Sequence, residues 1–222
     1  MVASDTDSPA AEAFRTLRTN LQFAGGDRPI RTIAVTGAGP DEGKTTVAGN
    51  LAATLAMGGT RTLVVGADLR RPALHRLFGV SGEVGLTQVL LGRVALEQAV
   101  QRLEPLGLDF LAAGAIPPNP AELLGSQRMA ELLEVLSSRW EAVILDTPPV
   151  LGLADASVVA ARVDGTLLVV TVGLTTREGA QLARRQLQQV GARLLGVVVN
   201  GVSPEGSYYR YYYYRYRPSR EA

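Results

Sequence analysis

The chain has 222 residues, 46% of them apolar, and a formal net charge of +1. This size and composition predict one folded domain, exclude a chain too polar to form a core, and give no electrostatic case for a nucleic-acid partner. With no cysteine and one histidine, a disulfide framework, a thiolate metal site and a multi-histidine site are excluded. No apolar run reaches the roughly 20 residues of a membrane span and no signal pattern opens the chain, which predicts a cytoplasmic location.

Helical and strand patterns alternate along the chain. Helices are predicted over residues 9–23, 43–57, a stretch ending near 139, 154–161 and 178–190, with short helical pieces over 73–103. Short apolar strands are predicted over residues 31–36, 62–65, 108–111, 141–145, 166–171 and 194–200. This alternation predicts an α/β domain over residues 1–202, a parallel β-sheet flanked by helices on both faces. Residues 203–222 fall outside the pattern and are predicted to be a disordered tail.

The first predicted strand leads into the sequence AVTGAGPDEGKTT, which opens a helix. A glycine-rich loop in that context is typical of a Walker A motif, whose N–H groups cradle phosphates. Lys44 is the only lysine among 22 basic side chains, and an arginine fork cannot replace a compact ammonium in a tight site. Lys44 is expected to reach the β- and γ-phosphates of ATP, and the Thr45 hydroxyl to bind Mg²⁺. Strict spacing places the first glycine of the motif at Ala38, whereas Gly37 stands one residue earlier.

The predicted nucleotide-binding residues of this loop are Gly39, Asp41, Glu42, Gly43, Lys44, Thr45 and Thr46. Two aspartates follow other predicted strands, Asp146 before Thr-Pro-Pro and Asp68 within LVVGADLRRP. The carboxyl ends of parallel strands meet at a ligand crevice, so Asp146 is placed to bind Mg²⁺ through water, the Walker B role. Lys44, Asp68 and Asp146 are the predicted catalytic residues, and Thr45, Asp68 and Asp146 the predicted metal residues.

All seven tyrosines lie within nine residues near the C-terminus, interleaved with arginines. Core aromatics are spread along a chain, so this cluster indicates a chemical purpose, and the chemistry of an exposed phenol is phosphorylation. The predicted phosphorylation sites are Tyr208, Tyr209, Tyr211, Tyr212, Tyr213, Tyr214 and Tyr216.

These segments resemble the cytoplasmic kinase domain of the bacterial tyrosine kinases of capsule and exopolysaccharide synthesis, which are similar in fold to the MinD/ParA P-loop ATPases. The resemblance rests on GPDEGKTT, GADLRRP, ILDTPPVLGLADA, IPPNPAELLGS, the tyrosine cluster and the pattern Glu12-x-x-Arg15-x-x-Arg18. It implies an autokinase that uses ATP and Mg²⁺ and phosphorylates the tail of a neighbouring copy, in a ring joined through Glu12, Arg15 and Arg18. It also implies that Asn200 contacts the adenine, although a turn residue at a strand end fits this position equally well.

The resemblance further implies a membrane polysaccharide co-polymerase as activator, a tyrosine phosphatase that resets the system, and a position at the inner face of the cell membrane. One departure matters, because Gly66 stands where the family pattern Asp-x-Asp-x-Arg has its first aspartate. That carboxylate is implicated in Mg²⁺ handling and in activating the tyrosine hydroxyl. Three functions therefore stay open: an active kinase, a nucleotide-binding pseudokinase, and an ATPase switch of the MinD/ParA type.

Overall fold

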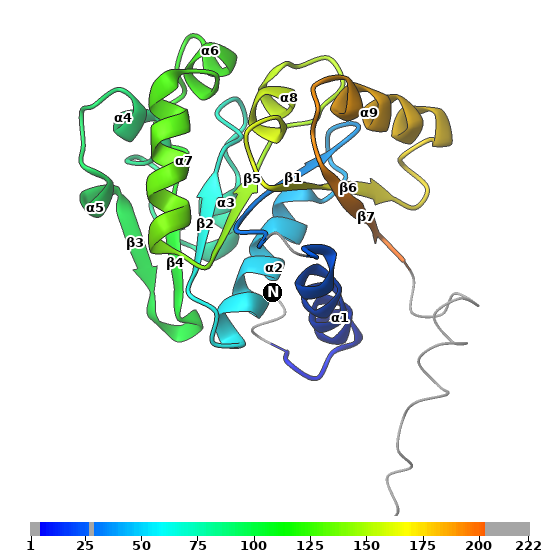
Figure 1. Cartoon of the computed structure of the whole chain (residues 1–222). Helices are drawn as coiled ribbons and strands as arrows, with labels where there is room; N and C mark the ends of the chain where they lie inside the picture. The colour runs from blue at the N-terminus through cyan, green and yellow to red at the C-terminus, as the bar shows by residue number, and fades with distance from the viewer. Residues whose placement is uncertain (1–4, 27–28, 203–222) are drawn as a thin grey trace, which may run out of the picture.

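The computed structural model describes residues 5–26 and 29–202 (Figure 1). Within them a seven-stranded sheet has the order β3-β4-β2-β5-β1-β6-β7. Its strands are β1 (Thr32–Gly37), β2 (Thr62–Gly66), β3 (Val100–Leu103), β4 (Leu108–Leu111), β5 (Ala142–Asp146), β6 (Gly165–Thr171) and β7 (Leu194–Asn200). All neighbours run parallel except β3 and β4. The predicted tail and its tyrosines lie outside the described residues.

Helices cover both faces of the sheet (Figure 1). They are α1 (Pro9–Ala24), α2 (Lys44–Met57), α3 (Leu74–Phe78), α4 (Leu86–Leu90), α5 (Leu96–Ala99), α6 (Pro120–Leu124), α7 (Gln127–Arg139), α8 (Asp155–Ala160) and α9 (Arg177–Gln189). Helices α1, α2 and α3 pack on one face, and α4, α7, α8 and α9 on the other. Neighbouring strand residues point to opposite faces, so Val35 packs with α2 while Ala34 packs on the opposite side. The predicted α/β class is confirmed.

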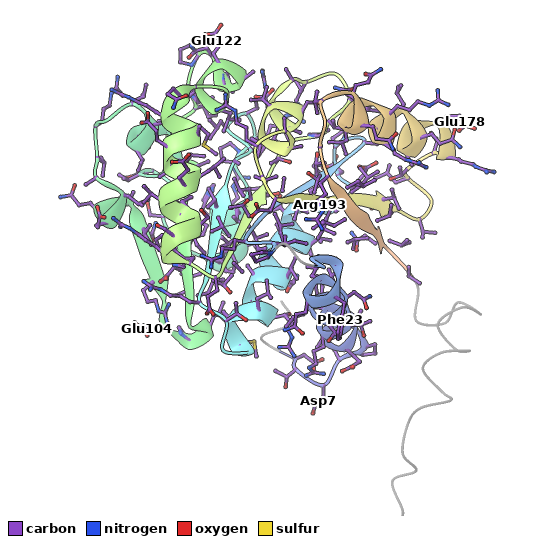
Figure 2. All side chains as sticks on the ribbon, in the orientation of Figure 1. Asp7, Phe23, Glu104, Glu122, Glu178 and Arg193 are labelled. Atoms are coloured by element: carbon purple, nitrogen blue, oxygen red, sulfur yellow. The ribbon has the colours of Figure 1, made fainter. Side chains whose placement is uncertain are left out.

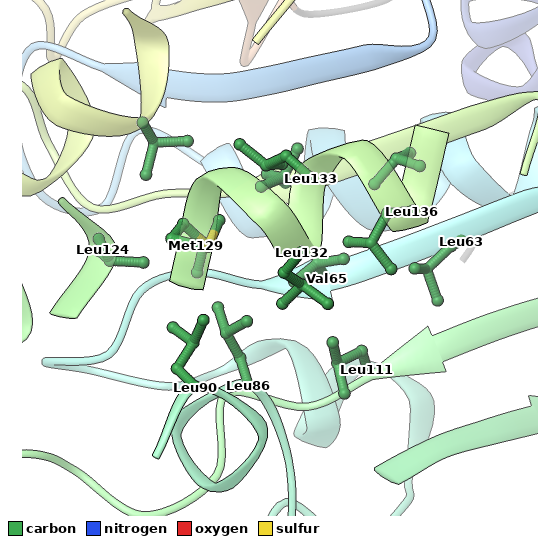
Figure 3. Packing of buried hydrophobic residues seen from close by; sticks show 14 of the residues in the cluster. Leu63, Val65, Leu86, Leu90, Leu111, Leu124, Met129, Leu132, Leu133 and Leu136 are labelled. Carbon is green, nitrogen blue, oxygen red and sulfur yellow. The ribbon is translucent and has the colours of Figure 1, made fainter. Parts of the chain in front are cut away.

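Helix α7 illustrates how the helices bury the apolar faces of the sheet. Leu132, Leu133 and Leu136 of α7 face Leu63 of β2 and Leu111 of β4 in one buried cluster (Figure 3). Each leucine buried in this way contributes about 1.5–3 kcal/mol of hydrophobic stabilisation. The strands therefore read as continuous apolar runs, because both of their faces are covered.

Two predictions about elements were wrong. Residues Val100–Leu103 form an antiparallel edge strand, where only helical pieces were predicted, because they pair with Leu108–Leu111 through a turn at Gly107 with φ 60°. The single helix predicted to end near Arg139 is divided into α6 and α7 at Gly125. A new helix starts there because the Ser126 hydroxyl accepts a hydrogen bond from the Met129 N–H at 3.3 Å.

Helix α1 lies outside the sheet, over α2. Its stripe of Phe14, Leu17 and Leu21 packs against the buried cluster that contains the apolar residues of α2. Arg193 donates hydrogen bonds to the carbonyls of Ala24 and Gly25 and so holds the end of α1 beside the start of β7; Figure 2 labels this arginine. No helix of the described residues is long and apolar enough to cross a membrane.

Candidate active site

The loop between β1 and α2 has a shape suited to phosphate. Asp41 and Gly43 both have left-handed backbone, with φ of 59° and 80°. Such residues curl the chain so that N–H groups converge on a concave surface. A Cβ at Gly43 would lie 2.1 Å from Nδ2 of Asn200, so only glycine fits there. Helix α2 begins at Lys44 without a side-chain cap, which leaves its first N–H groups to bind an anion.

Lys44 is 7% exposed and its Nζ donates a hydrogen bond to the Gly39 carbonyl at 2.7 Å. Burial lowers the pKa of Lys44, and the carboxylates of Glu42, Asp146, Asp68 and Asp41 act in the opposite direction. Lys44 is thus a buried ammonium group among carboxylates. Its positive charge would attract an anionic ligand, and a metal cation bound with that ligand would offset the carboxylates.

Asp146 comes to the same place from β5, whose register sets it opposite Val35 of β1 and Gly66 of β2. It is 2% exposed, and its Oδ1 has no hydrogen-bond partner among the described residues. Burial raises the pKa of Asp146 to about 7, against the effect of a hydrogen bond with Thr45. A buried carboxylate oxygen without a partner is costly unless a ligand, ion or water satisfies it.

Asp68 lies at the end of β2 and lines the same cavity. Its Oδ1 accepts hydrogen bonds from the backbone N–H groups of Arg70 at 3.1 Å and Arg71 at 2.9 Å. These bonds fix the orientation of the carboxylate and leave Oδ2 as its remaining acceptor. The three predicted catalytic residues therefore come together from α2, β2 and β5.

The cavity has a volume of about 670 Å³. The phosphate-binding loop, the segment after β2, Ile116 and Pro149 surround it. Its lining residues are Pro40, Asp41, Gly43, Lys44, Thr45, Asp68, Arg70, Arg71, Pro72, Ala73, Arg76, Ile116 and Pro149. Other predicted site residues do not line it, namely Gly39, Glu42, Thr46, Asn200 and the predicted catalytic and metal residue Asp146.

One ion pair beside the cavity has no signal in the sequence. Arg70 Nε contacts both carboxylate oxygens of Asp155, at 3.1 and 3.2 Å, across 85 residues of chain. The Asp155 side chain is completely buried and that of Arg70 is 40% exposed. The pair anchors Arg70 at the cavity wall, and sequence reasoning missed Asp155 because nothing in the local pattern at the start of α8 distinguishes it from a helix-capping residue.

Magnesium fits this arrangement. Among the described residues there is no group of three or more His, Cys, Asp or Glu side chains that would hold a metal ion alone. Mg²⁺ does not need one, because it keeps several waters and binds one or two carboxylates together with substrate phosphates. The unpartnered Asp146 Oδ1, with Thr45 and Asp68 beside it, provides such a partial set of oxygen ligands.

Gly66 is closely packed at the end of β2. A Cβ built on it would lie 2.9 Å from the backbone nitrogen of Ala113. Because Gly66 is paired with Asp146, an aspartate at this position would add a second carboxylate beside the first. The backbone of Ala112 and Ala113, after β4, lies against the position of that Cβ.

The residues predicted to form an assembly surface lie on α1. Arg15 Nη1 pairs with Glu12 Oε2 at 2.7 Å, and Arg18 Nη1 donates to the Thr54 carbonyl of α2 at 3.2 Å. None of the three residues lines the candidate active site. Arg18 is thus bound to α2, whereas Arg15 makes exposed contacts with Glu12 and, through Nη2, with the Thr6 carbonyl.

Comparison with known proteins agrees with this geometry. Residues 30–195 match a family described as an AAA domain. The chain is 44% identical over 203 residues to the tyrosine-protein kinase YwqD of Bacillus subtilis strain 168, which covers 91% of this chain and 86% of YwqD. It is 42% identical over 204 residues to the tyrosine-protein kinase etk of Escherichia coli strain K12, but spans only 28% of that protein.

Solved structures give the same result. The kinase domain of the Escherichia coli tyrosine kinase ETK has a TM-score of 0.89 and 40% identity, covering 93% of this chain and 81% of that one. The BceF tyrosine kinase domain has a TM-score of 0.82 and 39% identity, covering 91% and 82%. MinD from Pyrococcus horikoshii, solved with Mg-ADP, has a TM-score of 0.65 and 24% identity over 76% of this chain and 69% of that one, which shows a common fold alone. The chain belongs to the bacterial tyrosine-kinase family, whose P-loop fold is that of MinD.

Proposed function

We propose that this chain is a protein-tyrosine autokinase that uses ATP and Mg²⁺ to phosphorylate the tyrosines between positions 208 and 216 of a neighbouring copy. The observation that carries the proposal is the cavity lined by Lys44, Thr45 and Asp68, behind which the buried carboxylate of Asp146 hydrogen-bonds Thr45 and keeps one oxygen without a partner. Its relatives YwqD and etk are named tyrosine-protein kinases, which supports the same reaction here.

Each residue then has a definite part in the transfer. Thr45, Asp146 and Asp68 would hold Mg²⁺, which neutralises charge on the phosphates when it is bound. Lys44 and the loop N–H groups stabilise the negative oxygens of the γ-phosphoryl group. The tyrosine oxygen bonds to the γ-phosphorus as the bond from that phosphorus to the oxygen bridging to ADP breaks. The phenol, with a pKa of about 10, must give up its proton. We assign its acceptance to Asp68 Oδ2, the acceptor of this cavity residue that no backbone N–H occupies, as the alternative to its part in holding Mg²⁺.

The setting of this reaction is proposed from the likeness to the family. The copies would form a ring through Glu12, Arg15 and Arg18, regulate the synthesis and export of a capsular polysaccharide or exopolysaccharide, and work at the inner face of the cell membrane. A membrane co-polymerase would activate the kinase and a tyrosine phosphatase would reset it. The nucleotide-bound MinD structure supports the cofactor choice as a property of the fold.

The reaction is tested by incubating the purified chain with Mg-ATP and mapping phosphate by mass spectrometry. We expect several phosphates on the tail tyrosines and none in Lys44→Met. Intact ATP hydrolysis without tyrosine phosphate, in both the wild type and Gly66→Asp, would overturn the kinase and leave an ATPase switch.

A second candidate function is a nucleotide-binding pseudokinase, favoured by the packing at Gly66. The first carboxylate of the family pattern is missing, and the backbone of Ala113 lies in the space it would need. General base catalysis contributes about 10²–10⁴-fold, so this loss would slow transfer strongly if Asp68 did not replace it. Tail phosphate that appears only in Gly66→Asp would assign this second function.

A further inference from the structure

The carboxylate of Glu42 is buried behind the phosphate-binding loop and does not line the candidate active-site cavity. It is 2% exposed, and the residues on either side of it, Asp41 and Gly43, have the left-handed backbone that curls the loop. A buried carboxylate in such a place must have partners. The side chain of Glu42 finds them in two segments of the chain, and its backbone carbonyl is held by a third.

The first partner is the loop itself. Glu42 Oε2 accepts a hydrogen bond from the Gly39 N–H at 3.0 Å, which ties the two ends of the curl together. A Cβ at Gly37 would lie 2.2 Å from the same oxygen. The glycine at position 37, one residue before the strict Walker A position, is therefore required by the Glu42 side chain. The strict position is free to carry Ala38, whose methyl group packs in the core.

The second partner is the loop between β6 and α9. The Thr175 hydroxyl donates to Glu42 Oε1 at 2.6 Å and accepts a hydrogen bond from the Thr171 N–H at 2.9 Å. The Thr171 hydroxyl in turn donates to the Glu42 carbonyl at 2.7 Å. Residue 42 is thus held by side chain and backbone to a segment about 130 positions away in the chain.

The third partner is the end of β7. Asn200 Nδ2 donates to the Glu42 carbonyl at 3.2 Å, and the same amide lies against Gly43. We infer that Glu42 is a positioning residue that holds the phosphate-binding loop in its anion-binding shape and joins it to the β6–α9 loop and to β7. This role would let Lys44 exchange the Gly39 carbonyl for a phosphate without loss of the curl.

The inference rests on the proposed function, which supplies its ligand, a magnesium nucleotide. It is tested by measuring the affinity for that ligand, without any measurement of phosphate transfer. The probe is Mg-ADP, titrated calorimetrically into the 222-residue chain, so that phosphate transfer plays no part. Glu42→Ala removes two acceptors and is expected to weaken Mg-ADP binding about tenfold or more. Glu42→Gln keeps an acceptor for Gly39 and a partner for Thr175, so its loss should be clearly smaller.

The chain offers a matched pair of adjacent threonines. Thr175→Val removes the hydroxyl that bonds Glu42 and is expected to weaken Mg-ADP binding about fivefold, while Thr175→Ser should recover most of that loss. Thr176→Val removes a hydroxyl of the same loop that only accepts from the Gly179 N–H at the start of α9. It should lower thermal stability slightly and leave the affinity for Mg-ADP unchanged.

Two further measurements distinguish a positioning role of Glu42 from a general loss of stability. Combining Glu42→Ala with Thr175→Val should cost little more affinity than Glu42→Ala alone, because both variants break the same bond. In the autokinase assay, Thr175→Val should raise the KM for ATP more than it lowers kcat. Equal Mg-ADP affinity of Thr175→Val and wild type would overturn the inference, as would equal losses in Thr175→Val and Thr176→Val. A wild-type chain that binds no Mg-ADP would overturn both the inference and the proposed function, whereas one that binds Mg-ADP without tyrosine transfer overturns the kinase alone.

Discussion

Among single residues, Asp146 is a buried carboxylate whose negative charge is needed for its proposed role in holding Mg²⁺. Its pKa of about 7 lies above the usual value of an aspartate, so the folded protein binds this proton more tightly than the unfolded chain does. Between about pH 4 and pH 7 the free energy of unfolding contributed by this group therefore falls as pH rises. The cost is greatest above pH 7, where Asp146 is charged in its buried site.

Asp146→Asn should accordingly stabilise the nucleotide-free protein at pH 8, by about 3 kcal/mol, and change little at pH 4. Urea unfolding of both proteins across this range measures the difference. Glu131→Gln, at an exposed carboxylate of α7, is the control and should show no such pH dependence. Parallel stability curves for Asp146→Asn and wild type from pH 4 to pH 8 would contradict the raised pKa.

The close packing around Gly66 predicts a measurable loss of stability when a side chain is added there. Because its Cβ would meet the backbone of Ala113 at 2.9 Å, Gly66→Ala should cost about 1–3 kcal/mol of unfolding free energy. Gly196→Ala in β7 is the matched control, since no atom lies within 4 Å of the position of its Cβ. Thermal unfolding compares the two variants, and equal stabilities would show that the β2 end has room. Any kinase activity gained by Gly66→Asp should be judged against Gly66→Ala, which carries the steric cost without the carboxylate.

At the scale of elements, the two arginines of α1, Arg15 and Arg18, make different kinds of contact with the rest of the domain. Arg18 donates to the Thr54 carbonyl near the C-terminal end of α2, where a cation is favourable, while Arg15 pairs with Glu12 at the surface. A change at Arg18 therefore affects the packing of α1 on α2 as well as any assembly, whereas a change at Arg15 removes only exposed contacts, with Glu12 and with the Thr6 carbonyl.

We expect Arg18→Ala to lose about 1 kcal/mol of unfolding free energy and Arg15→Ala to lose less, because exposed ion pairs contribute little. If Arg15 joins copies in a ring, analytical ultracentrifugation should show smaller assemblies of Arg15→Ala at unchanged thermal stability. Arg184→Ala, at an exposed position of α9, should keep the assembly of the wild type. An Arg15→Ala protein that assembles fully would remove this residue from the interface.

For the whole molecule, the open question is which copy supplies the tyrosines. The active-site residues lie on the described domain, and the tyrosines lie in the last 20 residues, which carry four arginines against two glutamates. Each phosphate adds a charge of about −1.5 to −2, so two phosphates would reverse the sign of this segment. Phosphorylation would thereby change the electrostatic attraction between the segment and its neighbours.

Transfer of phosphate between copies is tested by mixing two variants, neither of which can phosphorylate its own tail. Lys44→Met provides tyrosines without a working site, and a variant with all seven tail tyrosines changed to Phe provides the site without acceptors. Mass spectrometry should find phosphate on the Lys44→Met chain, at a rate that rises with the concentration of the other variant. No phosphate on the Lys44→Met chain, together with a concentration-independent rate in the wild type, would indicate transfer within one copy.

Much of the site was predictable because its parts have local signatures. The loop before α2, its lysine and the aspartates at the ends of β2 and β5 follow from hydrophobic strands that end in polar residues, and the parallel sheet then brings those ends together. The edge strand Val100–Leu103 was missed since four residues beside short helices, two half-buried, one exposed and one buried, carry no clear period, and only pairing with β4 makes them a strand.

The sequence by itself determined the fold class, the phosphate-binding loop, the acidic strand ends and the tyrosine cluster, because each depends on residues that are neighbours in the chain. The tertiary structure alone decided that Glu42 faces away from the cavity toward Thr175 and Asn200, that Arg70 is anchored by Asp155, and that Ala113 closes the space at Gly66. These contacts join segments about 45 to 160 residues apart, and the hydrogen bonds and close packing that create them have no counterpart in local sequence pattern.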